Sequence, residues 1–104
     1  MSDPAWKTAI TKVEPDKVLV RGYPLDGLIG VCSFSQVLYL VLKGQMPSRE
    51  VGRLIDAILV SSVDHGAGPP SVLTARTAAS TGSELNACIA AGVLAISRFH
   101  GGAI

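Results

Sequence analysis

Charged and aromatic residues are scarce in this chain. Charged residues make up 16% of its 104 residues and aromatic residues 5%, whereas about 25% charged residues is usual for a soluble domain. Hydrophobic residues make up 48%, and a chain of this size cannot hide that much apolar surface in its own core. Because exposed apolar patches usually mark surfaces that other protein covers, we expect either an obligate oligomer or a missing second half.

The sequence also lacks a basic stripe, a secretory signal and a membrane-spanning run. Its net charge is +1 and its Lys and Arg residues are scattered, so nothing indicates a nucleic-acid partner. The start, Met1-Ser2-Asp3-Pro4, carries an acid and a proline and no apolar run, unlike a signal peptide. The longest apolar stretches, residues 54–63 and 87–96, are shorter than the ~20 residues that cross a bilayer. We therefore expect no membrane partner.

Cysteine is nearly absent. The chain has two cysteines, Cys32 and Cys88, far apart and without a CxxC motif. A reduced protein in the cytoplasm is the simplest interpretation, with both thiols as small hydrophobic core groups.

The N-terminal part predicts a small β-hairpin over residues 8–22. Short β-branched runs at Ile10 to Val13 and Val18 to Val20 flank Pro15 and Asp16, and Pro followed by Asp is typical of a turn. Residues 21–24 (RGYP) are expected to end the hairpin, and a loop through Gly27 and Gly30 is expected next. The sequence therefore places its only β element before residue 23.

Helices are expected across residues 33–104. Ser33 followed by Gln36 is a capping-box pattern, which predicts a helix start, and Gly44 fits the residue after the helix end. Three more helices are expected from Ser48 to near residues 63–66, from Ser71 to about Ser80, and from Ser83 to near Arg98. With no internal repeat and no linker, residues 1–104 predict part of one mainly α domain.

The two histidines are the candidates for chemistry. His65 and His100 each stand at the expected end of a helix, followed by Gly66 and by Gly101-Gly102. A helix C-terminus stabilises a cationic imidazole, and glycine lets a ligand approach the backbone. The two corners could converge on one pocket. The alternative for each histidine is a helix cap or a hydrogen-bonded core residue.

Other polar residues are weaker candidates for a site. Ser71 could bind a carboxylate at a helix N-terminus, although N-cap duty alone explains it. Arg76 could bind an anionic substrate, or form a surface or dimer salt bridge. Asp64 with both histidines would give a metal only three ligands at no recognised spacing, so no metal is expected.

Five segments stand in one order along nearly all of the chain: residues 33–47 (SFSQVLYLVLKGQMP), 63–66 (VDHG), 76–82 (RTAASTG), 87–92 (ACIAAG) and 99–103 (FHGGA). In this order and spacing they resemble the signatures of the citrate synthase family, namely a helix of SFEEVLYLLLTGELP type, a DHE or DHG segment, an R-x-A-x-S-[ST]-G segment, a small-residue helix and an HGGA motif. DHG in place of DHE, together with His100, favours citryl-CoA lyase. Citrate or methylcitrate synthase is the alternative.

This resemblance implies a citrate synthase-like helical fold and roles for both histidines. His100 would donate a hydrogen bond to the thioester oxygen of a coenzyme A substrate, and His65 would bind the oxaloacetate end of it. Citryl-CoA would be cleaved to acetyl-CoA and oxaloacetate by a homodimer without a permanently bound cofactor. Further substrate-binding candidates are Ser71, Arg76, Gly101 and Gly102.

The chain departs from the family after Ala103. The family's catalytic Asp, a third His, its carboxylate-binding arginines and its main CoA-binding loop lie downstream of HGGA, and this sequence stops at Ile104. We therefore expect an N-terminal part of such an enzyme with little or no activity alone. The competing interpretations are a non-catalytic helical assembly fragment that retains the family's packing, and a two-histidine metal protein.

Overall fold

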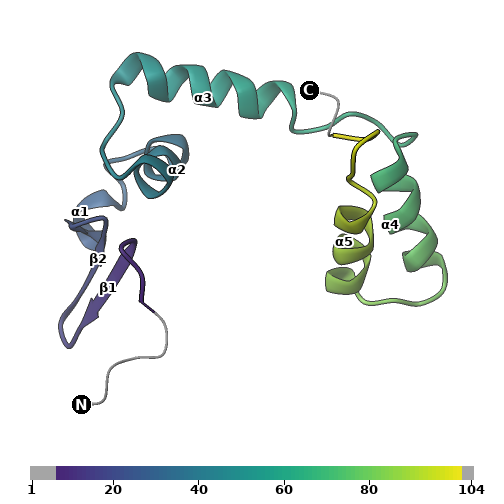
Figure 1. The fold of residues 1–104 in the computed structure, drawn as a ribbon, viewed down its shortest axis with the longest axis horizontal. Coiled ribbons are helices and arrows are strands. Elements are labelled where there is room, and N and C mark those ends of the chain that lie inside the picture. Colours follow the sequence, from purple (N-terminus) through teal and green to yellow (C-terminus); the bar gives the residue numbers. More distant parts are fainter. Residues whose placement is uncertain (1–6, 102–104) are drawn as a thin grey trace. The chain divides into compact units, whose positions relative to one another are not determined.

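The computed structural model describes residues 7–101, and Figure 1 shows their elements in chain order. The chain forms two compact units, Met1–Ser61 and Ser62–Ile104. The first unit contains a sheet and three helices, and the second contains two helices. About half of the chain is helical, so the mainly α prediction holds for residues 33–94, while the β part is larger than the predicted hairpin.

The sheet of the first unit has three antiparallel strands in the order β1-β2-β3: β1 (Thr11–Glu14), β2 (Lys17–Val20) and β3 (Tyr23–Pro24). The predicted hairpin supplies β1 and β2, with Glu14 opposite Lys17. The third strand was not predicted. It forms because Arg21 and Gly22 both adopt positive φ, 49° and 87°, which turns the chain back onto β2.

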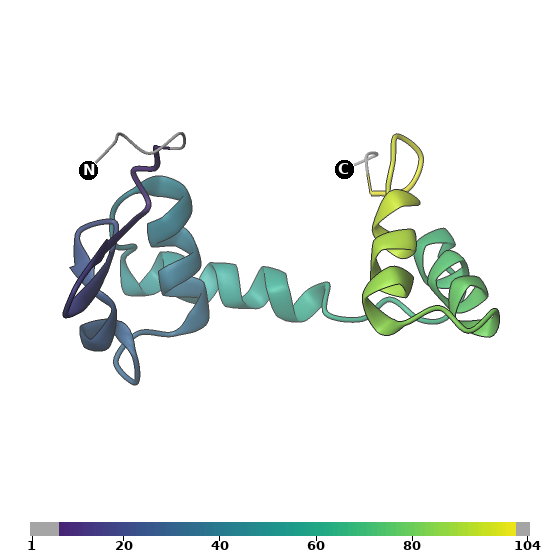
Figure 2. The same ribbon diagram turned by 90° about the horizontal axis from the view of Figure 1, so that it is seen from below.

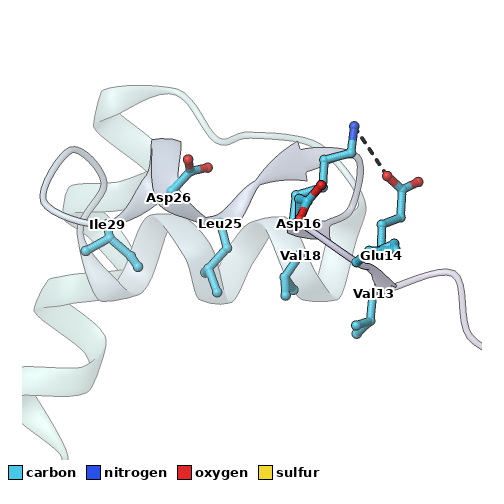
Figure 3. A pocket seen from close by; sticks show the side chains of 9 residues that line it. Val13, Glu14, Asp16, Val18, Leu25, Asp26 and Ile29 are labelled. Atoms are coloured by element: carbon cyan, nitrogen blue, oxygen red, sulfur yellow. Dashed lines mark ion pairs between the residues drawn. The ribbon is translucent and has the colours of Figure 1, made fainter.

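A short helix takes the place of part of the loop predicted through Gly27 and Gly30. This helix, α1 (Leu25–Leu28), buries Leu28 to 5% exposure. Beside it lies a groove of about 510 Å³ between the hairpin and α1. Figure 3 shows Val13, Val18 and Leu25 among its apolar lining, with the Asp16 and Asp26 carboxylates at its edge.

Helix α2 (Phe34–Lys43) begins and ends where the sequence predicts. The Ser33 hydroxyl accepts from the Gln36 N–H, the Gln36 side chain accepts from the Ser33 N–H, and Gly44 ends the helix in the left-handed conformation. Arg21 ties the sheet to this helix, because its Nε and Nη2 donate to the Val41 carbonyl at 3.1 and 2.9 Å.

Helix α3 (Arg49–Ser61) follows and contacts α2. Ser35 on α2 is fully buried and its hydroxyl donates to Asp56 on α3 at 2.5 Å. Gly52 is buried at the same contact, where an added Cβ would meet only the Gln36 side chain, at 3.3 Å.

The second unit consists of α4 (Pro70–Ser80) and α5 (Leu85–Leu94), which pack side by side, as Figures 1 and 2 show. Two helix starts were predicted wrongly. Pro69 and not Ser71 is the N-cap of α4, because proline favours the first helical position, here Pro70. Glu84 and not Ser83 is the N-cap of α5.

Both helices before the histidines also end earlier than predicted. Helix α3 ends at Ser61 rather than near residues 63–66, and α5 ends at Leu94 rather than near Arg98. The last turn of α5 gives way to a separate turn in which Ser97 pairs with His100. Neither histidine therefore lies at the end of a helix.

Apolar surface remains exposed in both units. Among residues 7–101 the buried apolar side chains are Leu28, Leu40 and Cys88. On α5, Leu85 is 76% and Leu94 84% exposed, so this helix keeps apolar side chains exposed although it packs against α4. Such a surface is what a partner or further protein covers. No helix within the described part of the chain is long and apolar enough to cross a membrane.

Candidate active site

A tight turn at the end of α5 presents His100. Its N–H donates to the Ser97 carbonyl at 2.9 Å and its carbonyl accepts from the Ser97 N–H at 2.8 Å. Gly101 follows with φ 86°, and an added Cβ there would lie 2.8 Å from Cγ2 of Ile96. The backbone on both sides of His100 is therefore fixed by local bonding and packing.

The His100 ring is held by the first turn of α4. Nε2 of His100 lies 3.3 Å from the backbone nitrogen of Ser71 and 2.9 Å from its Oγ. A backbone N–H only donates, so Nε2 is the acceptor. The tautomer assigned from this network is the neutral ring with its proton on Nδ1. Nδ1–H is then the group that remains for a substrate.

This arrangement reverses the electrostatics expected from the sequence. The prediction of a helix C-terminus at each histidine is wrong, since α3 and α5 end earlier. The helix end that meets His100 is the N-terminus of α4, whose N–H groups carry partial positive charge. That end presents hydrogen-bond donors to Nε2 of His100, so Nε2 meets them with its lone pair.

His65 lies beside His100. The two ring centroids are 6.1 Å apart and the ring planes differ by 14°. His65 lies in a turn over residues 64–66, called here the His65 corner. In this turn the Asp64 carboxylate accepts a hydrogen bond from the Gly66 N–H at 3.2 Å, and Gly66 has a positive φ of 91°. His65 is exposed, whereas His100 is half-buried. The structure therefore brings together two imidazoles that are far apart in the sequence.

The other predicted site residues are placed differently. Ser71 is engaged with His100. Arg76 is exposed on α4, and its side chain forms no hydrogen bond or ion pair within residues 7–101. Both line a groove of about 420 Å³ between α4 and α5. Gly101 follows His100 in the turn, and Gly102 lies outside the described residues.

No grouping of three or more metal-ligating side chains occurs in the part of the chain that the structure describes. Asp64 accepts a hydrogen bond from its own turn. Within the same residues no carboxylate bonds to either histidine ring. The site is thus two neighbouring imidazoles, one oriented by Ser71 and one open to solvent.

Solved structures share this fold. Citryl-CoA lyase from Hydrogenobacter thermophilus is 48% identical to the chain with a TM-score of 0.89, over 96% of this chain and 39% of that one. Methanosaeta concilii ATP citrate lyase, solved as the D541A mutant in complex with (3S)-citryl-CoA, has a TM-score of 0.90 at 20% identity, over 100% of this chain and 17% of that one. The second likeness shows the fold alone.

Curated relatives and a family model also match this chain. A citrate synthase of Mycolicibacterium smegmatis is 36% identical over 73 residues, which is 56% of this chain and 20% of the relative. A 2-methylcitrate synthase of Mycobacterium tuberculosis is 44% identical over 43 residues, 39% of this chain and 11% of the relative. The family model "Citrate synthase, C-terminal domain" matches residues 46–104. The chain spans less than half the length of each of these proteins, and it belongs to the citrate synthase family.

Proposed function

We propose that the chain supplies the two-histidine half of an active site that cleaves citryl-CoA to acetyl-CoA and oxaloacetate. The observation that carries the proposal is the bonding of Nε2 of His100 to Ser71, which leaves Nδ1–H as an oriented donor beside His65. The similarity to a citryl-CoA lyase along 96% of this chain supports the choice of substrate.

His100 would act on the thioester group. Cleavage breaks the bond between the carbinol carbon of the citryl group and the methylene carbon next to the thioester. The bonding electrons move onto the methylene carbon and the thioester oxygen as an enolate, which a proton then converts to acetyl-CoA. A neutral Nδ1–H placed at that oxygen stabilises the developing charge without any rearrangement.

His65 would hold the other end of the substrate. As the bond breaks, the carbinol hydroxyl loses its proton to a base and becomes the ketone of oxaloacetate. The exposed His65 ring lies 6.1 Å from His100 between ring centroids, so an oxaloacetate group bound to it lies near the thioester bound to His100. A hydrogen bond from imidazole to this oxygen or to a neighbouring carboxylate binds the group.

The general base would come from protein beyond the described residues. No carboxylate within residues 7–101 bonds to either ring, and the chain spans 39% of the H. thermophilus lyase. Coenzyme A thioester is proposed as substrate and not as a resident cofactor. A homodimer and a cytoplasmic location belong to the same proposal, with the exposed apolar surface of α5 and the two free cysteines as their support.

The purified 104-residue chain should not cleave citryl-CoA, because no carboxylate within residues 7–101 bonds to either ring and the proposal assigns the transfer of the carbinol proton to protein beyond them. The assay couples released oxaloacetate to NADH oxidation by malate dehydrogenase, with a complete citryl-CoA lyase as the positive control. Cleavage by the chain at a rate near that control would show that its own residues supply the base.

A citrate or 2-methylcitrate synthase is the second candidate. The 44% identity to a 2-methylcitrate synthase over 43 residues favours it. The full-length natural product of the gene should be given citryl-CoA in one assay, and oxaloacetate with acetyl-CoA or propionyl-CoA in others. Faster release of CoA thiol in the condensation assays than of oxaloacetate from citryl-CoA would select the synthase.

Ser71→Ala should lower kcat/KM for citryl-CoA cleavage roughly tenfold, since loss of one hydrogen bond to Nε2 is worth about that factor. The effect stays moderate because the Ser71 backbone N–H still reaches Nε2. The matched control is Thr77→Ala, which removes a hydroxyl that bonds only to the Leu73 carbonyl of its own helix. Equal losses in both variants would show that helix stability, and not the ring contact, sets the rate.

A further inference from the structure

Gly92 allows α4 and α5 to approach closely. It is buried in α5, and an added Cβ would lie 3.0 Å from the Ser71 carbonyl oxygen and 3.3 Å from the Ala75 Cβ. Such contacts are shorter than carbon atoms usually tolerate. Figure 2 shows the two helices of the second unit side by side. Any side chain at residue 92 therefore pushes on the first turn of α4.

That turn is the one that orients His100. The carbonyl of Ser71 faces Gly92, while the N–H and hydroxyl of the same residue bond to Nε2 of His100 at 3.3 and 2.9 Å. The N–H and the carbonyl of one residue lie on adjacent peptide planes joined at its Cα, and the hydrogen bonds of the helix hold these planes in one rigid turn. A shift of a few tenths of an ångström at the carbonyl therefore moves both groups that hold the ring.

We infer that Gly92 is a positioning residue for His100, acting through Ser71. It sets the separation of the two helices at which both Ser71 donors meet Nε2 and keep the ring proton on Nδ1. Gly92 touches no substrate in this account. The consequence for rate rests on the proposed function, whereas the consequence for the tautomer does not.

A purely structural role predicts a different outcome for Gly92→Ala. Alanine is the better helix former at an interior position, so a glycine that merely fills the helix is replaced without harm. A second glycine offers a matched control. Gly52 is also buried in a helix, but its Cβ would meet only Cγ of Gln36, and it lies in the unit that contains neither histidine.

The test compares Gly92→Ala with Gly52→Ala in the full-length natural gene product. Histidine labelled with ¹⁵N reports which ring nitrogen of His100 carries the proton. In Gly92→Ala the Nε2 signal should move from the unprotonated position toward an average of the two tautomers. With citryl-CoA, kcat should fall roughly tenfold with KM little changed, as for a small misplacement of a catalytic group. Gly52→Ala should leave the ring signals and kcat as in the parent.

Ring signals that stay unchanged in Gly92→Ala would overturn the inference, whatever the enzyme's activity. If the gene product does not act on citryl-CoA, the proposed function fails, and the ring signals still decide the role of Gly92. Should Gly92→Ala not fold, Ala75→Gly loosens the same contact by removing a methyl group. Its Nε2 signal should also move toward the average, and an unchanged signal there would equally overturn the inference.

Discussion

Replacing His100 with alanine should lower kcat for citryl-CoA cleavage roughly 100- to 1,000-fold with little change in KM, as removal of one donor to a developing oxyanion does. The thioester oxygen gains charge only as the carbon–carbon bond breaks, so the donor stabilises the transition state more than the bound substrate. Steady-state kinetics of the full-length natural gene product measure both parameters. Circular dichroism checks that the variant keeps its helices.

Two further substitutions at His100 test which ring nitrogen donates the hydrogen bond to the substrate. The amide nitrogen of asparagine occupies the position of Nδ1, and that of glutamine the position of Nε2. Nε2 of His100 is already hydrogen-bonded to Ser71. For this reason His100→Asn should retain more activity than His100→Gln. The activity of His100→Gln should be as low as that of His100→Ala. The opposite order would mean that Nε2 faces the substrate and that the bond to Ser71 breaks during catalysis.

Replacing His65 with alanine should raise KM for oxaloacetate in the condensation direction and lower kcat/KM roughly 10- to 100-fold. A hydrogen bond to a charged partner contributes about 1.5–3 kcal/mol, which sets that range. The exposed ring forms no hydrogen bond within residues 7–101, so its removal should cost little stability. Isothermal titration with oxaloacetate separates binding from turnover.

The control for His65 is its neighbour in the turn. Asp64→Asn keeps the oxygen that accepts from the Gly66 N–H, so it removes a charge from the corner without removing the turn. It should change oxaloacetate affinity far less than His65→Ala does. Equal weakening in both variants would point to the shape of the corner, and not to the imidazole, as the binding feature.

Local sequence signals were sufficient where one residue type decides a structure. The capping box at Ser33 and Gln36 and the left-handed Gly44 bound α2 as predicted, because each depends on neighbours within one turn. The hairpin strands β1 and β2 were predictable for the same reason. The third strand was not, since Tyr23 and Pro24 become a strand only by pairing with β2.

Helix ends were predicted less well in the second unit. Ser71 and Ser83 are good N-cap residues by type, but Pro70 takes the first helical position and shifts the start of α4. The early end of α5 at Leu94 depends on the turn that pairs Ser97 with His100. Residue preferences alone place a helix end only to within one or two residues, so they do not distinguish between neighbouring candidates such as Pro70 and Ser71.

The contact between Ser71 and His100 could not be predicted from the sequence. It joins residues from two helical segments and depends on how closely α4 and α5 approach. The sequence identifies Gly92 only as one of the small residues of segment 87–92. Small residues that face another helix indicate that the two helix backbones lie close together. The motif pattern identified both histidines, and the structure supplies the orientation of one of them.

The most direct test of the account is a chimera in which this chain replaces the matching 39% of the H. thermophilus citryl-CoA lyase. In such a chimera the remaining part of the H. thermophilus lyase supplies the rest of the active site. It should cleave citryl-CoA at a rate within about tenfold of the lyase, and His100→Ala within it should remove roughly 99% or more of that rate. A folded chimera that is inactive, or one that His100→Ala leaves fully active, would contradict the claim that this chain supplies the enolate-stabilising half of the site.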